Sequence, residues 1–171
     1  GGTFDITILR LEDGVFQVKS SGGDSALGGD DMDRAVAEVL LEQMGVAGSA
    51  PPEAVALALS AARELKHALT EQETASIELP AKGGANVVAT LTRARLNELI
   101  QPLLERTGKA CRRALRDAGL EAAALDGVIL VGGSTRVPRV RRYVAELFGK
   151  EPRCELEPEL VVAYGAALQA D

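Results

Sequence analysis

Four apolar residues that run directly into two glycines limit the folds open to this chain more than any other feature. Residues 128–131 read Val-Ile-Leu-Val, and residues 132–135 read Gly-Gly-Ser-Thr. A short all-apolar run is typical of a strand buried on both faces of its sheet. Pro138 then fits the first turn of a helix that reaches about Phe148. The sequence therefore predicts a strand, a glycine turn and a helix in succession, as in α/β proteins.

The N-terminal part of the chain predicts a β-hairpin. Residues 3–11 alternate between polar and apolar side chains, which indicates a half-buried strand. Residues 13–14 read Asp-Gly, a strong signal for a two-residue turn, and the apolar residues at 15–18 then form the return strand. Together with the strand and helix further along, this hairpin indicates a mixed sheet.

The middle of the chain predicts an inserted α+β segment. Apolar residues recur at helical spacing in three stretches. The first predicted helix ends at Gly45, and the second reaches about Thr70. The third is long and runs from an N-cap at Thr92 to Ala118, with Gly119 beyond its end. Two short strand-like segments lie at 76–79 and 86–91. Pro102 should kink or divide the long helix, because it lacks an N–H group.

Composition and charge exclude several classes of function. The chain is 46% hydrophobic and 26% charged, which supports a real core, and its net charge of −6 argues against a nucleic-acid or anionic-membrane surface. No apolar run approaches the roughly 20 residues of a membrane span. Two cysteines and one histidine give neither a disulfide framework nor a histidine metal site. Cys111 falls on an apolar helix face and is expected to be a small buried hydrophobe.

Three glycine-rich stops suggest anion binding. They lie at residues 1–3, 28–31 and 132–135. Glycine lets the backbone approach a bulky anion, and N–H groups at a turn bind phosphate oxygens. The hydroxyls of Thr3 and Ser134 could add hydrogen bonds, while Asp5 and Asp31 could hold a hydrated cation. The alternative is that the glycines only make tight turns, but three such stops in one short chain favour a ligand site.

Some other polar residues leave two interpretations open. Lys66 and Thr70 are four apart and share a helix face, with His67 one step round, so they could meet a ribose and a base. A solvated helix surface is the interpretation that the residues alone favour. Arg136 could stack on a planar ring or be an ordinary surface arginine. No nucleophile–base pair stands out, because His67 is the sole histidine.

Several stretches together closely resemble the ATPase domain of the seventy-kilodalton heat-shock chaperones. They are residues 1–5, 23–31, 128–138, 157–159 and 162–167. The similarity covers essentially the whole chain in order. Within the family, the sequences of residues 23–31 and of residues 98–115 look most like the bacterial member dedicated to iron–sulfur cluster assembly.

The resemblance implies an actin-like ATPase (ribonuclease H-like) fold, of which this chain is the second lobe. Its sheet subdomain would comprise residues 1–27 and 108–171, and its inserted subdomain residues 28–107. The chain begins at Gly1 without a methionine, and the family's preceding Asp-Leu-Gly and first lobe are absent from it. We therefore expect a piece of a longer protein. The resemblance implies a cytoplasmic location for that protein.

The resemblance also implies a nucleotide site. Gly2 and Thr3 would approach the γ-phosphate of ATP, and Asp5 would help to hold a Mg²⁺ or K⁺ ion through water. The residues that would line the adenosine and its phosphates, or lie near the base, are Gly132, Gly133, Ser134, Arg136 and Glu159.

The resemblance implies that the helix face at Lys66 contacts the nucleoside part of the nucleotide. Lys66 and Thr70 match positions that contact ribose and adenine, which reverses the preference for a solvated surface, and His67 falls where eukaryotic relatives have an adenine-stacking arginine. Arg63 stands where many relatives have a ribose-binding glutamate, so ribose contacts are expected to be weaker or differently made.

The implied activity depends on parts outside the chain. A site formed between two lobes cannot organise water, metal and γ-phosphate with one wall absent, so ATP hydrolysis by this chain alone should be negligible. The implied partners are the first lobe, a J-type co-chaperone and a peptide client such as an iron–sulfur scaffold protein. The alternatives are a non-catalytic module that docks co-chaperones or exchange factors, a general folding chaperone of the same family, and, more weakly, a sugar kinase.

Overall fold

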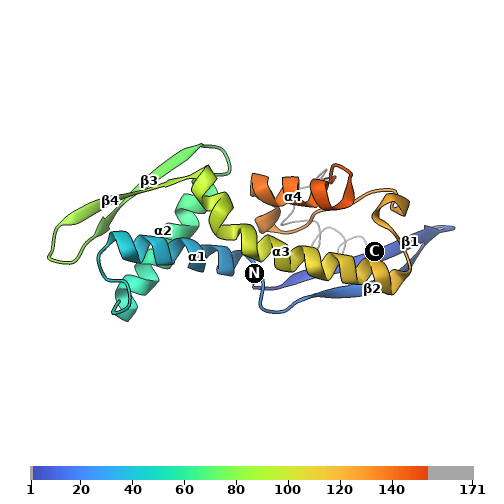
Figure 1. The fold of residues 1–171 in the computed structure, drawn as a ribbon, viewed down its shortest axis with the longest axis horizontal. Helices are drawn as coiled ribbons and strands as arrows, with labels where there is room; N and C mark the ends of the chain where they lie inside the picture. The colour runs from blue at the N-terminus through green and yellow to red at the C-terminus, as the bar shows by residue number, and fades with distance from the viewer. Residues whose placement is uncertain (1, 154–171) are drawn as a thin grey trace, which may run out of the picture. The chain divides into compact units, whose positions relative to one another are not determined.

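The structure, a computed structural model, describes residues 2–153 of the 171-residue chain and is mixed α/β (Figure 1). The elements in chain order are β1 (Phe4–Glu12), β2 (Val15–Asp24), α1 (Gly29–Gln43), α2 (Pro52–Ala68), β3 (Thr74–Pro80), β4 (Asn86–Thr92), α3 (Arg93–Ala118), the 3-10 turns η1 (Ala122–Ala124) and η2 (Gly133–Arg136), and α4 (Pro138–Phe148). Among the helices described, none combines the length and the apolar character that a membrane span requires.

The chain divides into two compact units. The first contains Gly2 and residues 28–103, and the second contains residues 3–27 together with the described residues from Leu104 onward. Helix α3 therefore contributes its first turns to the first unit and its remaining turns to the second.

The hairpin predicted at the N-terminus is confirmed. Strands β1 and β2 pair antiparallel from Phe4 opposite Asp24 to Glu12 opposite Val15, with a register shift between Ile8 and Leu9. The turn residues Asp13 and Gly14 both have positive φ, 51° and 77°, as a tight two-residue hairpin turn requires.

The prediction of a strand buried on both faces at residues 128–131 is wrong for the described residues. Ile129 forms only an isolated parallel bridge with Arg153, and both Ile129 (73% exposed) and Val131 (43% exposed) face solvent. A strand buried on both faces needs a ladder along its length and a layer on each side, and the described residues supply one bridge. Within residues 2–153, the pairing consists of two antiparallel hairpins, β1–β2 and β3–β4, and this parallel bridge.

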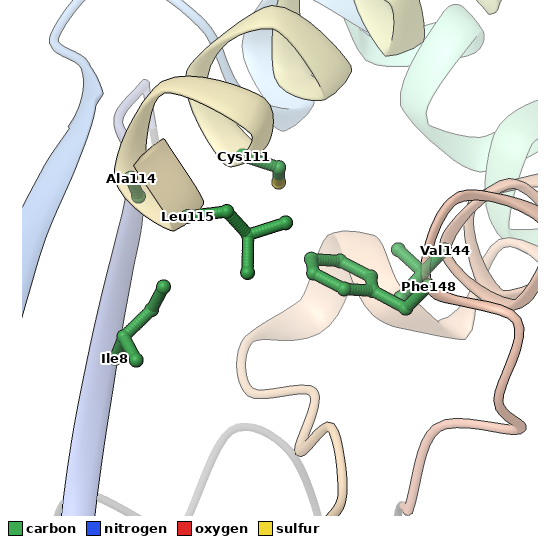
Figure 2. Packing of buried hydrophobic residues seen from close by; sticks show 6 residues of the cluster. All are labelled: Ile8, Cys111, Ala114, Leu115, Val144 and Phe148. Carbon is green, nitrogen blue, oxygen red and sulfur yellow. The ribbon is translucent and has the colours of Figure 1, made fainter. Parts of the chain in front are cut away.

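The core of the second unit lies between β1, the later turns of α3 and α4. Its buried side chains are Ile8, Cys111, Ala114, Leu115, Val144 and Phe148. Figure 2 shows the Phe148 ring and the Leu115 side chain pointing toward one another from α4 and α3. Cys111 is 3% exposed, as predicted, and burial raises the pKa of its thiol to about 11.

In the first unit, α1 and α2 pack together with the β3–β4 hairpin and the first turns of α3. Its largest fully buried side chains are Val36, Leu40, Leu65, Leu69, Leu79, Leu91, Leu96 and Ile100. The Lys82 N–H donates to the Met44 carbonyl at 2.9 Å, which joins the β3–β4 turn to the end of α1.

The helix ends predicted from capping residues and glycines are confirmed for α1 and α3. The Arg95 N–H donates to Thr92 Oγ1 at 3.1 Å, so Thr92 is the predicted N-cap of α3. Gly45 and Gly119 have positive φ directly after α1 and α3, as C-terminal glycines do. Helix α3 runs through Pro102 without a break, so the alternative that this proline divides the helix is wrong.

Candidate functional site

The glycine turn before α4 is held by hydrogen bonds between its own residues. Gly132 has φ 94° and ψ 152°, a conformation that favours glycine, and the chain then enters η2. The buried Thr135 hydroxyl donates to the Gly132 carbonyl at 2.7 Å, and the Thr135 N–H donates to the same oxygen at 3.0 Å. Among the described residues, no backbone carbonyl accepts from the N–H of Gly133 or Ser134. Such N–H groups are suited to an anionic oxygen.

A side chain of helix α4 also holds this turn. Its N-terminal Pro138 follows η2 after one residue, and the Arg141 Nε donates to the Thr135 carbonyl at 2.7 Å. Arg136 is exposed at the end of η2. The turn is thus fixed by the first turns of the helix that it precedes.

Lys66 is buried, which overturns the solvated-surface interpretation for this side chain. It is 6% exposed, and its Nζ donates to the Gly29 carbonyl at 3.1 Å. The same atom lies 2.6 Å from Asp33 Oδ1. Lys66 therefore ties α2 to the first turn of α1.

Two cations of α2 share one carboxylate of α1. Arg63 Nε donates to Asp33 Oδ2 at 3.2 Å, and Arg63 Nη2 donates to Asp30 Oδ1 at 3.3 Å. Sequence reasoning gave no role to Asp33. The signal was present, because Asp30 and Asp33 lie three apart on one helix face and Arg63 and Lys66 lie three apart on another.

The end of α2 carries the other two candidate residues of this helix. His67 is exposed. Thr70 is half-buried, and its hydroxyl donates to the His67 carbonyl at 2.7 Å, which satisfies one of the carbonyl groups at the helix end.

The N-terminal candidate residues lie at and before the start of β1. Gly2 is half-buried, and a Cβ at this position would lie 3.6 Å from Asp30 Oδ2. Thr3 and Asp5 are exposed, with Asp5 opposite Gly23 in the hairpin. In the part of the chain that the structure describes, no three His, Cys, Asp or Glu side chains gather in a metal-binding group.

Asp31, the other candidate for a hydrated cation, has local partners. Its Oδ2 accepts from the Gly28 N–H at 2.8 Å, and its Oδ1 pairs with Arg34 at 2.9 Å. An acidic side chain at this position stabilises the first turn of a helix, so Asp31 caps α1.

A second carboxylate that sequence reasoning passed over lies in the second unit. Asp24 Oδ1 accepts from the Ala26 N–H at 3.0 Å, and Arg106 Nη2 donates both to Asp24 Oδ2 at 2.6 Å and to the Ala26 carbonyl at 3.0 Å. The Ala26 N–H, and next the Arg106 guanidinium, lower the pKa of the Asp24 carboxyl. The end of β2 is thereby fastened to α3.

The candidate residues fall into groups that are each described within one unit. Gly2, Lys66, His67 and Thr70 belong to the first unit, and Thr3, Asp5, Gly132, Gly133, Ser134 and Arg136 belong to the second. Glu159 lies outside the described residues.

Comparison with known proteins supplies the context for these groups. The family model described as "Hsp70 protein" matches residues 1–171. A "Chaperone protein HscA homolog" of Azotobacter vinelandii is 50% identical over 171 residues, which are all of this chain and 27% of that relative. A homolog of the same name from Acidithiobacillus ferrooxidans is 52% identical, and the "Chaperone protein HscA" of Klebsiella pneumoniae is 50% identical, with the same coverage of both chains.

The resemblance that rested on the glycine motifs is thus confirmed at the level of the family. The chain spans about a quarter of the length of the curated relatives it matches. It belongs to the Hsp70 family, whose nucleotide-binding part has the actin-like ATPase fold.

Proposed function

We propose that this chain is the second lobe of the nucleotide-binding domain of an ATP-dependent Hsp70 chaperone. The observation that carries the proposal is a family match over residues 1–171, combined with about 50% identity to relatives of which the chain covers 27%. In the proposed lobe, residues 1–27 and 108–171 form the sheet subdomain, and residues 28–107 form the inserted subdomain.

The turn at residues 132–136 is the proposed site for the adenosine and phosphates of ATP or ADP. The fit is supported by Gly132, where nothing lies within 4 Å of the position that a Cβ would occupy, and by the available N–H groups of Gly133 and Ser134. Ser134 and Arg136 add a hydroxyl and a guanidinium. Glu159 is proposed to lie near the base.

The other proposed contacts with the nucleotide come from the N-terminal residues and from the C-terminal end of α2. Gly2 and Thr3 approach the terminal phosphate, and Lys66, with His67 and Thr70 beside it on α2, contacts ribose and adenine. Lys66 suits this role because an ammonium has three N–H donors, and among the described residues the Gly29 carbonyl is the one acceptor of a hydrogen bond from it.

Asp5 is the proposed link to the cation. Mg²⁺ keeps several water ligands and takes few carboxylates together with substrate phosphates. A single exposed carboxylate that acts through water fits such a site. The metal, or K⁺ beside it, supplies charge neutralisation at the phosphates when it is bound, and Asp5 orients its water shell.

In the whole protein we propose that ATP binding and hydrolysis switch a separate peptide-binding domain between weak and tight binding. The likeness to HscA supports a role in iron–sulfur cluster protein maturation, with a J-type co-chaperone and a cluster scaffold protein as partners. A cytoplasmic location belongs to the same proposal.

Calorimetry with ADP and Mg²⁺ tests the proposal. We expect weak heat on titration into this chain alone, and saturable binding after recombination with a first lobe from the same protein. If neither sample binds ADP, the nucleotide-lobe proposal is wrong. Strong capture of an exchange factor or J-protein in the absence of any ADP binding would favour a non-catalytic docking module instead.

A further inference from the structure

A buried carboxylate on the first helix has no part in the proposed function so far. Asp33 is 3% exposed, and it lies on α1 within the first unit. Its two oxygens face two cations of α2, with Lys66 Nζ 2.6 Å from Oδ1 and Arg63 Nε 3.2 Å from Oδ2. A buried carboxylate needs such countercharges, because an ion removed from water without a partner is strongly destabilising.

The two cations differ in their surroundings. The Arg63 side chain is 61% exposed, so solvent screens its pair with Asp33, and Asp30 accepts part of its donor capacity. The Lys66 side chain is nearly as buried as that of Asp33. The interaction with Lys66 is therefore the one in which Asp33 has a strong effect on the position of its partner.

The Lys66 ammonium is held at two points. Besides Asp33 Oδ1, its Nζ contacts the Gly29 carbonyl at the start of α1. Asp33 Oδ1 has no partner within hydrogen-bond geometry, so its contact with Lys66 acts through charge. One hydrogen-bond acceptor and one adjacent negative charge together restrict the position of the ammonium and the directions in which its other N–H groups point.

We propose that Asp33 is a positioning residue, whose carboxylate holds the Lys66 ammonium at the first turn of α1 so that an N–H group that is not bonded to Gly29 meets the ribose or adenine of the nucleotide. The inference rests on the proposed function, because it takes the nucleotide as the ligand of Lys66. Asp33 itself makes no contact with the ligand, and its effect on binding passes through Lys66.

A double-substitution cycle in the full-length protein that contains this chain tests the proposal. Asp33→Asn keeps the shape of the side chain and removes its charge, and Lys66→Met keeps the length of the side chain and removes the ammonium. Calorimetry with ADP and Mg²⁺ should show roughly tenfold weaker binding for Asp33→Asn, since a charged hydrogen-bonding partner is misplaced. Lys66→Met should weaken binding at least as much, and Asp33→Asn added to Lys66→Met should have no further effect.

A merely structural Asp33 predicts a different pattern. The loss of ADP affinity on Asp33→Asn would then be the same whether position 66 is Lys or Met, and that result would overturn the proposal. Unchanged ADP affinity in Asp33→Asn would overturn it as well. If the unsubstituted protein binds no ADP, the proposed function itself fails, so the two failures are distinguishable.

Two further variants guard against misfolding and against general charge effects. Asp33→Glu keeps the countercharge but moves it by one methylene, so it should fold and weaken ADP binding several-fold only when Lys66 is present. Glu38→Gln removes one negative charge from the exposed face of α1 and should leave ADP binding unchanged. Far-UV circular dichroism of every variant checks that the helices are retained, and the Asp33→Glu result decides the case if Asp33→Asn does not fold.

Discussion

Gly132 has a backbone conformation that other residues adopt only with strain. Its φ is 94°, and nothing lies within 4 Å of the position where a Cβ would be built. The cost of a side chain here is therefore a backbone cost and not a packing cost. A strain of about 1–3 kcal/mol is typical of a residue held in such a region.

Gly132→Ala is expected to lower the free energy of unfolding by about 1 kcal/mol or more, and to weaken ADP binding by shifting the N–H groups that follow it. Urea denaturation and calorimetry measure the two effects. Gly48→Ala is a matched control, because Gly48 also has a positive φ (77°) and open space around it, but lies in a loop of the first unit that no candidate residue uses. It should cost similar stability and leave ADP binding unchanged, and equal loss of binding in both variants would contradict the role of the turn.

Cys111 gives a pH dependence at the scale of one residue. Burial raises the pKa of its thiol from 9.0 to about 11, so between these values the unfolded chain releases a proton that the folded chain retains. The contribution of Cys111 to stability is thus intact below pH 9 and falls by about 2–3 kcal/mol as the pH rises to 11.

Urea denaturation at pH 8, 9, 10 and 11 measures this loss. Cys111→Ala should be less stable at pH 8 because the core loses the sulfur atom, but its stability should fall less steeply above pH 9. Parallel curves for the two proteins would show that the thiol ionises alike in the folded and the unfolded chain, so that burial does not raise its pKa.

Helix α3 begins at a side-chain cap. Thr92 Oγ1 accepts from the Arg95 N–H at 3.1 Å and so satisfies one of the donors that a helix start leaves free. Thr92→Ala is expected to cost about 1 kcal/mol in the free energy of unfolding, measured by urea denaturation. Thr92→Ser retains the oxygen and should cost much less, whereas equal losses for the two variants would mean that the methyl group, not the cap, matters.

Elements whose signals are local could be predicted from the sequence, and those that depend on distant partners could not. The Asp13-Gly14 turn, the Thr92 cap and the glycine after α3 are each encoded within a few residues, and the structure has all three. The apolar run at 128–131 gives no information on its neighbours, and in the described residues it pairs only through Ile129.

The same distinction applies to the candidate site. The turn at Gly132 follows from adjacent residues, since only glycine adopts its φ easily. The buried state of Lys66 depends on Asp33, which is 33 residues away on another helix, so helix spacing alone suggested a solvated face. Recognising the charge complement between Asp30 and Asp33 on one helix and Arg63 and Lys66 on the other would have required knowing that α1 and α2 pack together.

At the scale of the whole molecule, the candidate residues suit nucleotide binding, and none of them is proposed as a catalytic residue. The proposed ligands are backbone N–H groups, hydroxyls, an ammonium and one carboxylate, which in the proposed site would together bind and orient a nucleotide. Phosphoryl transfer to water needs, in addition, a positioned nucleophile and a metal held at the γ-phosphate. The chain covers 27% of the length of its relatives, and under the proposed function the remaining groups belong to the first lobe.

ATP hydrolysis should therefore be indistinguishable from the uncatalysed rate for this chain alone, and should appear when a first lobe of the same protein is added. Release of inorganic phosphate from ATP in the presence of Mg²⁺ and K⁺ measures both samples. Asp5→Asn in the recombined sample should reduce hydrolysis more than it reduces ADP binding, because the carboxylate is proposed to orient the water around the metal and not to contact the nucleotide. Hydrolysis by the isolated chain that survives repurification and is lost in Asp5→Asn would contradict this division of the site, because a complete catalytic centre would then lie within these 171 residues.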